Sequence, residues 1–130
     1  MSETNLIDIV KKLYACLPAG DWDTYAALTQ PDFCVVEASS LPYAGVHQGM
    51  DGFMKLIEIV FGTFSEFDAQ PAGYYQNGDT VMVDVNIRMT GRASGKTIDT
   101  QLIEVFRFKD GKLAEIKPYY FDSDLINSIV

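Results

Sequence analysis

The residues best suited to acid–base chemistry are two glutamates next to apolar runs. Glu104 lies within residues 102–106 (LIEVF), and Glu37 follows residues 34–36 (CVV). A carboxyl group in apolar surroundings loses hydration, which raises its pKa and lets it donate a proton or hold an oxyanion. Glu37 also precedes a loop, and a rigid strand end positions a general base well. Both have a structural alternative: Glu104 could pair with an arginine of a neighbouring row, and Glu37 could be a solvated strand end.

Further polar residues could line the same site. Alternation along a strand puts Tyr120 and Asp122 on one face; Tyr120 could bind a ligand carbonyl, or the segment could be a strand-terminal turn. His47, the one histidine, lies in a Pro/Gly loop, either as a surface residue or as an acid–base group at a pocket mouth. Asp84 and Asn86 share a strand face. If this is the concave face of the sheet, they line a pocket; if it is the convex face, they belong to a solvated surface or a dimer interface.

Composition excludes several functions. A chain of 130 residues, 48% of them hydrophobic, suits one domain spanning residues 1–130. A net charge of −8 disfavours nucleic acids and anionic membranes as partners. Residues 1–4 are polar, unlike a signal peptide, so we expect a cytoplasmic protein. One histidine and two cysteines, expected to be reduced, make a metal site or a Ser-His-Asp triad hard to assemble, and no Gly-rich phosphate loop is present.

Apolar periodicity predicts helices first and strands later. Helices are expected over residues 6–17, from a cap at Asp21 to about Gln30, and from a cap at Asp51 to residue 64. Strands are expected over residues 33–37, 66–76, 80–90, 97–108 and 112–121, with a short helix or edge strand at the end. Trp22 and Phe53 are typical of a core but could also line a pocket. This order predicts an α+β fold whose twisted antiparallel meander wraps a helical layer and leaves a cavity on its concave face.

The order of elements and several motifs resemble the nuclear-transport-factor-2-like superfamily, especially its SnoaL-like polyketide cyclases and ketosteroid-isomerase-like proteins. The motifs are residues 19–23 (AGDWD), 32–33 (DF), 41–46 (LPYAGV), 106–113 (FRFKDGKL) and 119–122 (YYFD). The resemblance implies a cystatin-like cone, in which a curved mixed or antiparallel sheet surrounds a central pocket, and it implies a homodimer.

The resemblance also implies roles for individual residues. Counted from these motifs, the base of the steroid isomerases falls on Glu37, and the acid that holds the enolate oxygen falls on Glu104. The tyrosine of that site falls on Leu13, with Tyr14 one residue away, a step of about 100° around a helix. In the SnoaL-like cyclases an aspartate near the end of the last strand is the base, and Asp122 is similar to it.

Three kinds of function are consistent with these features. The favoured one is an isomerase, cyclase or dehydratase that moves a proton next to a carbonyl in a hydrophobic compound and needs neither a cofactor nor a metal. The second is a binding domain that holds an apolar small molecule without changing it. The third is a dimeric protein-interaction module that uses the sheet face of residues 80–90.

Overall fold

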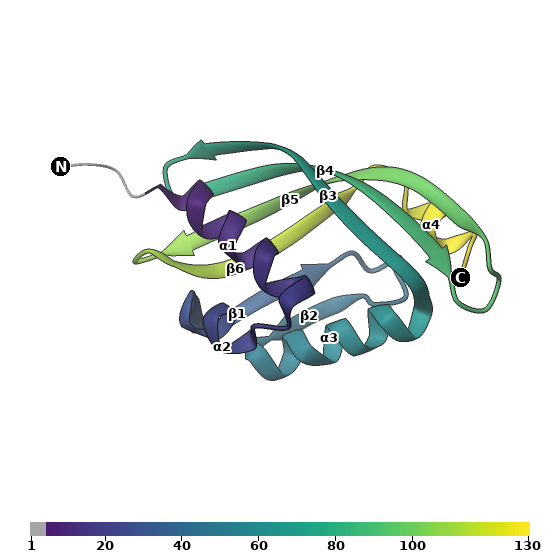
Figure 1. Cartoon of the computed structure of the whole chain (residues 1–130), viewed down its shortest axis with the longest axis horizontal. Coiled ribbons are helices and arrows are strands. Elements are labelled where there is room, and N and C mark those ends of the chain that lie inside the picture. Colours follow the sequence, from purple (N-terminus) through teal and green to yellow (C-terminus); the bar gives the residue numbers. More distant parts are fainter. Residues whose placement is uncertain (1–4) are drawn as a thin grey trace.

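Helices come first and a long meander last, as the sequence predicts. The computed structural model describes residues 5–130; the polar segment 1–4 lies outside the described residues. The elements are α1 (Leu6–Ala19), α2 (Trp22–Ala27), β1 (Thr29–Glu37), β2 (Gly45–Gln48), α3 (Gly49–Thr63), β3 (Phe64–Asn77), β4 (Thr80–Gly91), β5 (Thr97–Lys109), β6 (Lys112–Tyr120) and α4 (Ser123–Asn127) (Figure 1). The strand β2, in the predicted loop, was not expected.

The helix ends follow local side-chain chemistry. The Asn5 side chain accepts a hydrogen bond at the start of α1, and Gly20 ends that helix in the left-handed conformation, with φ 64°. Asp21 caps α2 as predicted, because its Oδ1 accepts the Thr24 backbone N–H at 3.2 Å. The predicted cap at Asp51 is wrong: α3 begins at Gly49, and Asp51 lies in its first turn, where its charge complements the helix dipole.

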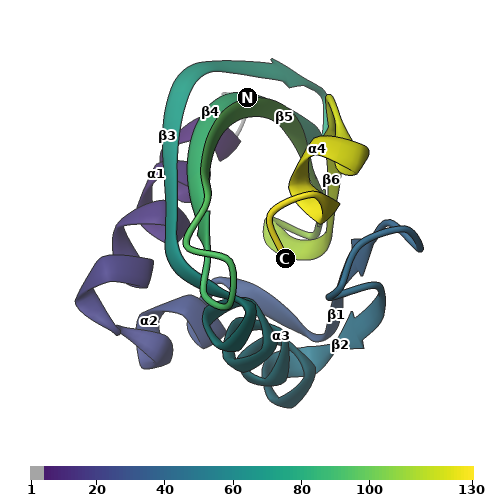
Figure 2. The same ribbon diagram turned by 90° about the vertical axis from the view of Figure 1, so that its right-hand side faces the viewer.

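The strands of residues 5–130 form a six-stranded sheet against which the helices pack. Its strand order is β2-β1-β6-β5-β4-β3. The run from β3 to β6 is the predicted antiparallel meander, whereas β1 pairs with β6 in parallel. Figure 2 shows that the sheet curls into an arch that stays open at the side where α3 lies. The mixed, curled sheet with its helices confirms the expected α+β fold.

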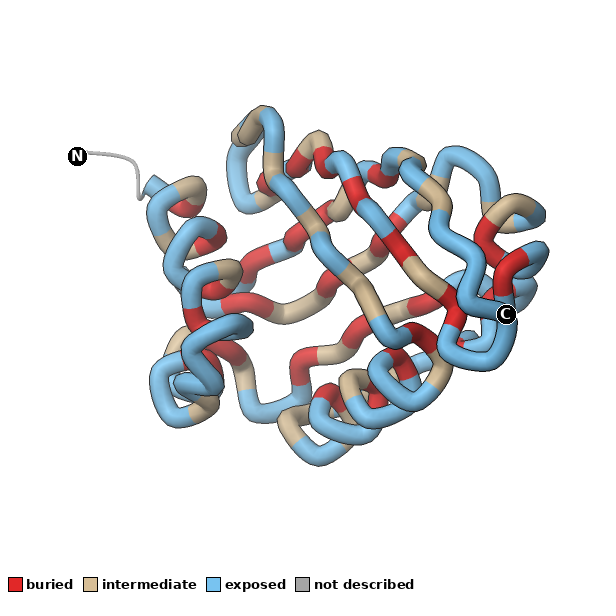
Figure 3. The backbone as a smooth tube through the Cα atoms, turned by 45° about the vertical axis from the view of Figure 1, so that its right-hand side comes forward, coloured by how far each residue is buried: buried red, intermediate tan, exposed pale blue. Residues whose placement is uncertain are grey.

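Alternation along β4 separates the inside of the arch from its outside. The residues Val81, Val83, Val85, Ile87 and Met89 are all buried. Met82, Asn86 and Arg88, which alternate with them, are exposed, and Asp84 is half-buried. Figure 3 shows the same alternation of buried and exposed segments along the strands. The face that carries Asp84 and Asn86 is therefore the convex, outer face.

Helices cover the inner face of the arch. The helix α3 packs against β1, β2 and β3, and α1 packs against β3 and β4. After α4, the chain returns to the core with Ile126 and Ile129, both almost completely buried. None of the helices in residues 5–130 combines the length and the hydrophobicity that a membrane span requires.

The end of β4 leaves no room for a side chain at Gly91. A Cβ atom built there would overlap the carbonyl oxygen of Ile129, which also accepts a hydrogen bond from Ser94. We expect Gly91→Ala to lower the free energy of unfolding by about 1–3 kcal/mol, because the C-terminal segment must move out of the core. Urea denaturation measures this change.

The matched control is Gly62→Ala in α3. A Cβ atom at this position meets no atom within 4 Å, and alanine favours the helix over glycine by up to about 1 kcal/mol. We therefore expect Gly62→Ala to raise stability slightly. A stability loss at Gly62 as large as that at Gly91 would show that steric overlap is not the cause.

Candidate functional site

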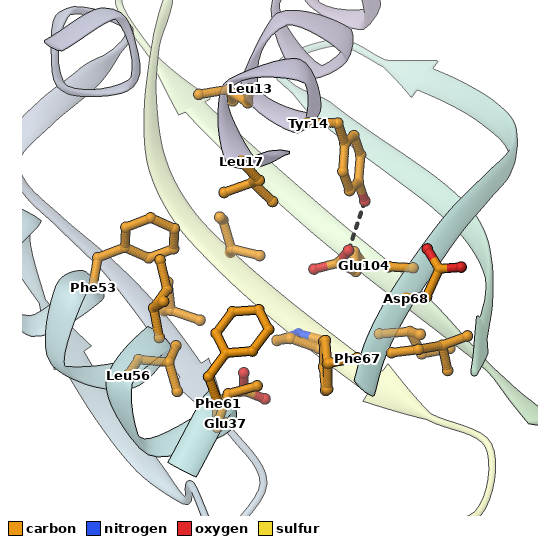
Figure 4. A pocket seen from close by; sticks show the side chains of 18 of the residues that line it. Leu13, Tyr14, Leu17, Glu37, Phe53, Leu56, Phe61, Phe67, Asp68 and Glu104 are labelled. Carbon is orange, nitrogen blue, oxygen red and sulfur yellow. Dashed lines mark hydrogen bonds between the residues drawn. The ribbon is translucent and has the colours of Figure 1, made fainter. Parts of the chain in front are cut away.

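A cavity lies between the inner face of the sheet and the helices α1, α2 and α3. Its volume is about 550 Å³. Most of its wall is apolar; the apolar lining includes Leu13, Leu17, Trp22, Val35, Phe53, Leu56, Val60, Phe61, Phe67, Ile87, Leu102, Phe106 and Ile116. Figure 4 shows these walls with the polar groups that interrupt them. A cavity of this size and polarity suits a small organic ligand.

Exposed residues mark the mouth of the cavity. Leu17 at the end of α1 is 40% exposed and Phe61 near the end of α3 is 50% exposed, and both line the cavity. Asp68 and Gln70 on β3 line it from the other side, and the Gln70 side-chain amide donates to Asp68 Oδ1 at 2.7 Å. A ligand would therefore enter between α1, α3 and β3.

The inner wall holds a tyrosine–carboxyl pair. The Tyr14 hydroxyl donates to Glu104 Oε1 at 2.6 Å, joining α1 to β5 (Figure 4). Phe106 packs edge-on against the Tyr14 ring, with ring centroids 5.7 Å apart, and fixes its direction. Burial raises the pKa of Glu104 and the Tyr14 hydrogen bond partly opposes that rise. Burial and the Glu104 charge raise the pKa of Tyr14, which therefore stays a proton donor.

Glu37 supplies a second carboxyl group to the same cavity. It ends β1, is 8% exposed, and its Oε1 has no hydrogen-bond partner among the described residues. Burial, with a smaller contribution from the Glu104 charge, raises the pKa of Glu37 to about 8. At neutral pH this carboxyl group is largely protonated, and it becomes a base as the pH approaches 8.

Two tyrosines lie next to Glu37. Tyr120 on β6 lines the cavity. Tyr43, from the loop before β2, packs edge-on against the Tyr120 ring, with the ring centroids 6.2 Å apart. No atom of the described residues lies in hydrogen-bonding geometry with the Tyr43 hydroxyl group. Burial raises the pKa of both tyrosines. This end of the cavity therefore presents the neutral Tyr120 hydroxyl and the Glu37 carboxyl group, whose Oε1 lacks a partner among the described residues.

The structure brings some of the candidate residues together and separates others. Tyr14, Glu37, Glu104, Tyr120, Trp22 and Phe53 all line the cavity. The arginines that could have paired with Glu104 are engaged elsewhere: Arg88 with Glu66 and Asp99, and Arg107 with Glu115. Tyr14, rather than the register position Leu13, donates to Glu104; the buried Leu13 contributes an apolar side chain to the cavity wall.

Four candidates lie outside the cavity. Asp122 is exposed and caps α4, accepting the Leu125 backbone N–H at 3.0 Å. Asp122 and Asn86 border a second, more open depression near α4, and Asp84 lies on the outer face with Asn86. The half-buried His47 binds the Tyr43 backbone oxygen through Nε2 at 2.9 Å. In residues 5–130, no group of three or more histidine, cysteine, aspartate or glutamate side chains is arranged to hold a metal ion.

Sequence reasoning missed the residues of the mouth. Asp68 and Gln70 alternate along β3 with Phe67 and Ala69, and all four line the cavity where β3 crosses its mouth. Their polar–apolar alternation indicates a strand, but it does not reveal that the strand borders a cavity. The packing of α1 and α3 against β3 decides that.

Comparison with known proteins places this geometry in a family. The sequence profile of the SnoaL-like domain matches residues 10–116. A nuclear-transport-factor-2-like protein of unknown function from Burkholderia pseudomallei has a similar structure, with a TM-score of 0.88, 20% identity and coverage of 98% of each chain. No curated protein matches this chain.

Two further solved structures bear names that describe an activity. A protein from Jannaschia sp. CCS1, provisionally named a SnoaL-like polyketide cyclase, aligns over 98% of this chain and 94% of its own, with a TM-score of 0.73 and 15% identity. A protein from Rhodopseudomonas palustris, provisionally named an isomerase, aligns over 98% and 96%, with a TM-score of 0.70 and 15% identity. At these identities the likeness concerns the fold.

Proposed function

The chain belongs to the SnoaL-like domain family, and from this premise we propose that it is a cofactor-independent enzyme of the isomerase or cyclase type. The reaction is the movement of a proton next to the carbonyl group of an apolar compound. The proposal rests on one observation: Glu37 and the hydrogen-bonded Tyr14–Glu104 pair line the same apolar cavity. Similar folds named as a polyketide cyclase and an isomerase support the reaction class.

Each of the three polar groups has a part in this reaction. Glu37, in its ionised form, takes the proton from the carbon next to the carbonyl. Tyr14 holds Glu104 Oε1 by donating to it, so that a proton on the other oxygen of Glu104 is free to donate to the carbonyl oxygen as it becomes an enolate. Return of the proton from Glu37 to another carbon of the enolate completes an isomerisation.

The cavity itself favours this chemistry. The apolar walls exclude water, so a hydrogen bond to the developing oxyanion is stronger than it would be in solvent. Burial raises the pKa of Glu104, which favours the protonated form that can donate to the oxyanion. The raised pKa of Glu37 makes it a stronger base once it is ionised, at the cost of a smaller ionised fraction at neutral pH.

Exchange of carbon-bound protons tests this proposal without knowledge of the natural substrate. Cyclic ketones of one to four rings, including 2-tetralone, are incubated with the protein in D₂O, and loss of the α-proton signal is followed by NMR. We expect exchange faster than in buffer for the ketones that fit the cavity. No acceleration for any ketone would count against proton abstraction and favour a binding domain that leaves its ligand unchanged.

Tyr14→Phe tests the contribution of the tyrosine–carboxyl pair. Removing the hydroxyl takes away a hydrogen bond that lowers the pKa of Glu104 and leaves the Glu104 side chain free to rotate. We expect the exchange rate to fall by about 10–100-fold, which is less than the roughly 10²–10³-fold that follows loss of a direct oxyanion donor, because Glu104 itself remains. Tyr75→Phe, on an exposed tyrosine outside the cavity, is the matched control and should leave the rate unchanged.

The homodimer implied by the resemblance is proposed to form through the outer face of the sheet. This face exposes Tyr75, Met82, Ile103 and Tyr119. Tyr75 pairs in register with Met82, and Ile103 with Tyr119, so the apolar side chains lie on adjacent strands. A contiguous exposed apolar area of this kind is typical of a contact surface.

Ile103→Lys is expected to convert the dimer into a monomer, because it puts a charge in the middle of that surface. Light scattering after size exclusion at micromolar concentration measures the mass. Val46→Lys adds the same charge to an exposed apolar residue of β2 and should leave the dimer intact. A wild-type protein that is monomeric at this concentration would contradict the proposed interface.

A further inference from the structure

The cavity has an uneven charge composition. Three carboxyl groups line it: Glu37 and Glu104 inside, and Asp68 at the mouth. None of its lining residues is a lysine, an arginine or a histidine. The carboxyl groups therefore face the ligand without a positively charged partner among the lining residues.

Within the cavity, the Glu37 carboxyl group is available to pair with a ligand. Glu104 already accepts a hydrogen bond from the Tyr14 hydroxyl. Glu37 is only 8% exposed, and its Oε1 has no hydrogen-bond partner within residues 5–130. A buried carboxyl group without a partner is costly, and a charged donor from a ligand would satisfy it. A ligand anion would find no positively charged side chain among the described residues that line the cavity.

We propose that the cavity also binds apolar amines, with the ammonium group of the ligand paired to Glu37 and its hydrocarbon part against the aromatic walls. The site selects by charge: a cation binds better than a neutral compound of the same shape, and an anion binds worse. This inference goes beyond the proposed reaction and does not depend on turnover.

The residue types that line the cavity favour an organic cation over a metal ion. Trp22, Tyr25, Phe53, Phe61 and Phe67 contribute aromatic surface to the walls, which attracts an ammonium group through its π-electrons and covers a hydrocarbon body. A calcium or magnesium ion instead needs about six oxygen ligands. The residues that line this cavity offer two interior carboxyl groups, one of which is already hydrogen-bonded.

Pairing with an ammonium group has a proton balance that can be measured. An alkylammonium group carries its proton at pH 7, as a lysine side chain does. The pKa of Glu37 is about 8 in the unliganded protein, so Glu37 must lose its proton to the buffer as the ion pair forms. The other ionisable side chains of the cavity are Tyr14 on α1, Tyr25 on α2, Asp68 on β3, Glu104 on β5 and Tyr120 on β6, with Tyr43 behind Tyr120.

Three ligands that differ mainly in charge provide the first test. The dissociation constants of 2-naphthylmethylamine, 2-naphthalenemethanol and 2-naphthoic acid are measured by isothermal titration calorimetry at pH 7. We expect the amine to bind at least about tenfold more tightly than the alcohol, and the acid at least about tenfold more weakly, each about one charge interaction in size. Equal or tighter binding of the alcohol relative to the amine would overturn the proposal.

Proton release on wild-type protein is the second test and needs no variant. The titration of the amine is repeated at pH 7 in buffers with different ionisation enthalpies, which gives the number of protons released. We expect a release approaching one proton for the amine, since about nine-tenths of a group with a pKa one unit above the pH is protonated, and none for the alcohol. A release near zero for the amine would mean that the ammonium group does not pair with Glu37.

Glu37→Gln locates the ion pair. It should reduce the preference for the amine over the alcohol to about threefold or less, while binding of the alcohol changes little. Glu58→Gln removes an exposed carboxyl group of α3 that does not line the cavity and should keep the full preference. An amine preference that survives in Glu37→Gln would assign the cation to another carboxyl group and contradict the proposal.

The outcome is separable from that of the proposed reaction. If the ketones show no exchange but the amine binds with proton release, the charge selection stands and the enzyme proposal fails. If exchange occurs but the amine has no advantage, the opposite holds. If both hold, the amine should inhibit the exchange competitively, since its ammonium group takes the place of the proton that Glu37 removes.

Discussion

Replacing Glu37 with glutamine is expected to slow enzyme-catalysed α-proton exchange by about 10²–10⁴-fold, the usual contribution of one general acid–base group. An amide has nearly the shape of the carboxyl group but cannot accept the proton from carbon. Glu37 ends β1 and lines the cavity, and its Oε1 has no hydrogen-bond partner in the part of the chain that the structure describes, so the substitution disturbs few other contacts. Initial exchange rates by NMR at pH 8 measure the effect.

The matched controls separate this role from a general electrostatic effect. Glu58→Gln makes the same chemical change on the exposed side of α3 and should leave the rate within about fivefold of the wild type, since about 1 kcal/mol or less is at stake for exposed charges. Asp68→Asn tests the carboxyl group at the mouth, which has the Gln70 amide as a partner. A full rate in Glu37→Gln combined with a large loss in Asp68→Asn would assign the base to Asp68.

The second large effect is a fall in stability as the pH rises from about 4.5 to about 8. Glu37 has a folded-state pKa of about 8, above its ordinary value of 4.5. Below pH 4.5 Glu37 carries its proton in both the folded and the unfolded state, so its contribution to the free energy of unfolding does not change with pH. Between these values the unfolded state loses the proton and the folded state keeps it, so stability decreases by up to about 1.4 kcal/mol per pH unit. The decrease ends above the folded-state pKa.

Urea denaturation at pH 5, 7 and 9 measures this dependence. Glu104 acts in the same direction because burial raises its pKa too. Glu37→Gln removes one of the two contributions, so its stability should change less with pH and exceed that of the wild type at pH 9. The exposed control Glu58→Gln should follow the wild-type curve. A wild-type protein that becomes more stable from pH 5 to pH 9 would show that the buried carboxyl groups are not the dominant titrating groups.

Most of the fold could be predicted because its local signals agree with its tertiary packing. The helix cap at Asp21 and the alternation along β4 each define an element without knowledge of the rest of the chain. The strand β2 could not be found this way: it has four residues and is exposed along most of its length. Pairing of Val36 with Val46 and of Glu37 with Gly45 creates it.

The candidate site was only partly predictable, for geometric reasons. The alternation of the β5 sequence shows that Glu104 shares a strand face with Leu102 and Phe106. The hydrogen-bond partner of Glu104, however, comes from α1, and its position depends on how that helix packs against the sheet. The rotation of α1 turns Tyr14 toward Glu104 and places Leu13 in the apolar part of the cavity wall. Asp122 lies two residues after the end of β6, where the chain turns into α4, so its side chain caps a helix instead of reaching the cavity.

The pH dependence of α-proton exchange by the wild-type protein tests the central claim most directly, namely that Glu37 and the Tyr14–Glu104 pair act together on one ligand. We predict that the enzyme-catalysed rate for the best ketone of the panel rises about tenfold per pH unit below pH 7 and levels off near pH 8, and that Glu37→Gln removes this rise. A rate that does not exceed that of buffer for any ketone, or a rise with pH that persists unchanged in Glu37→Gln, would contradict it.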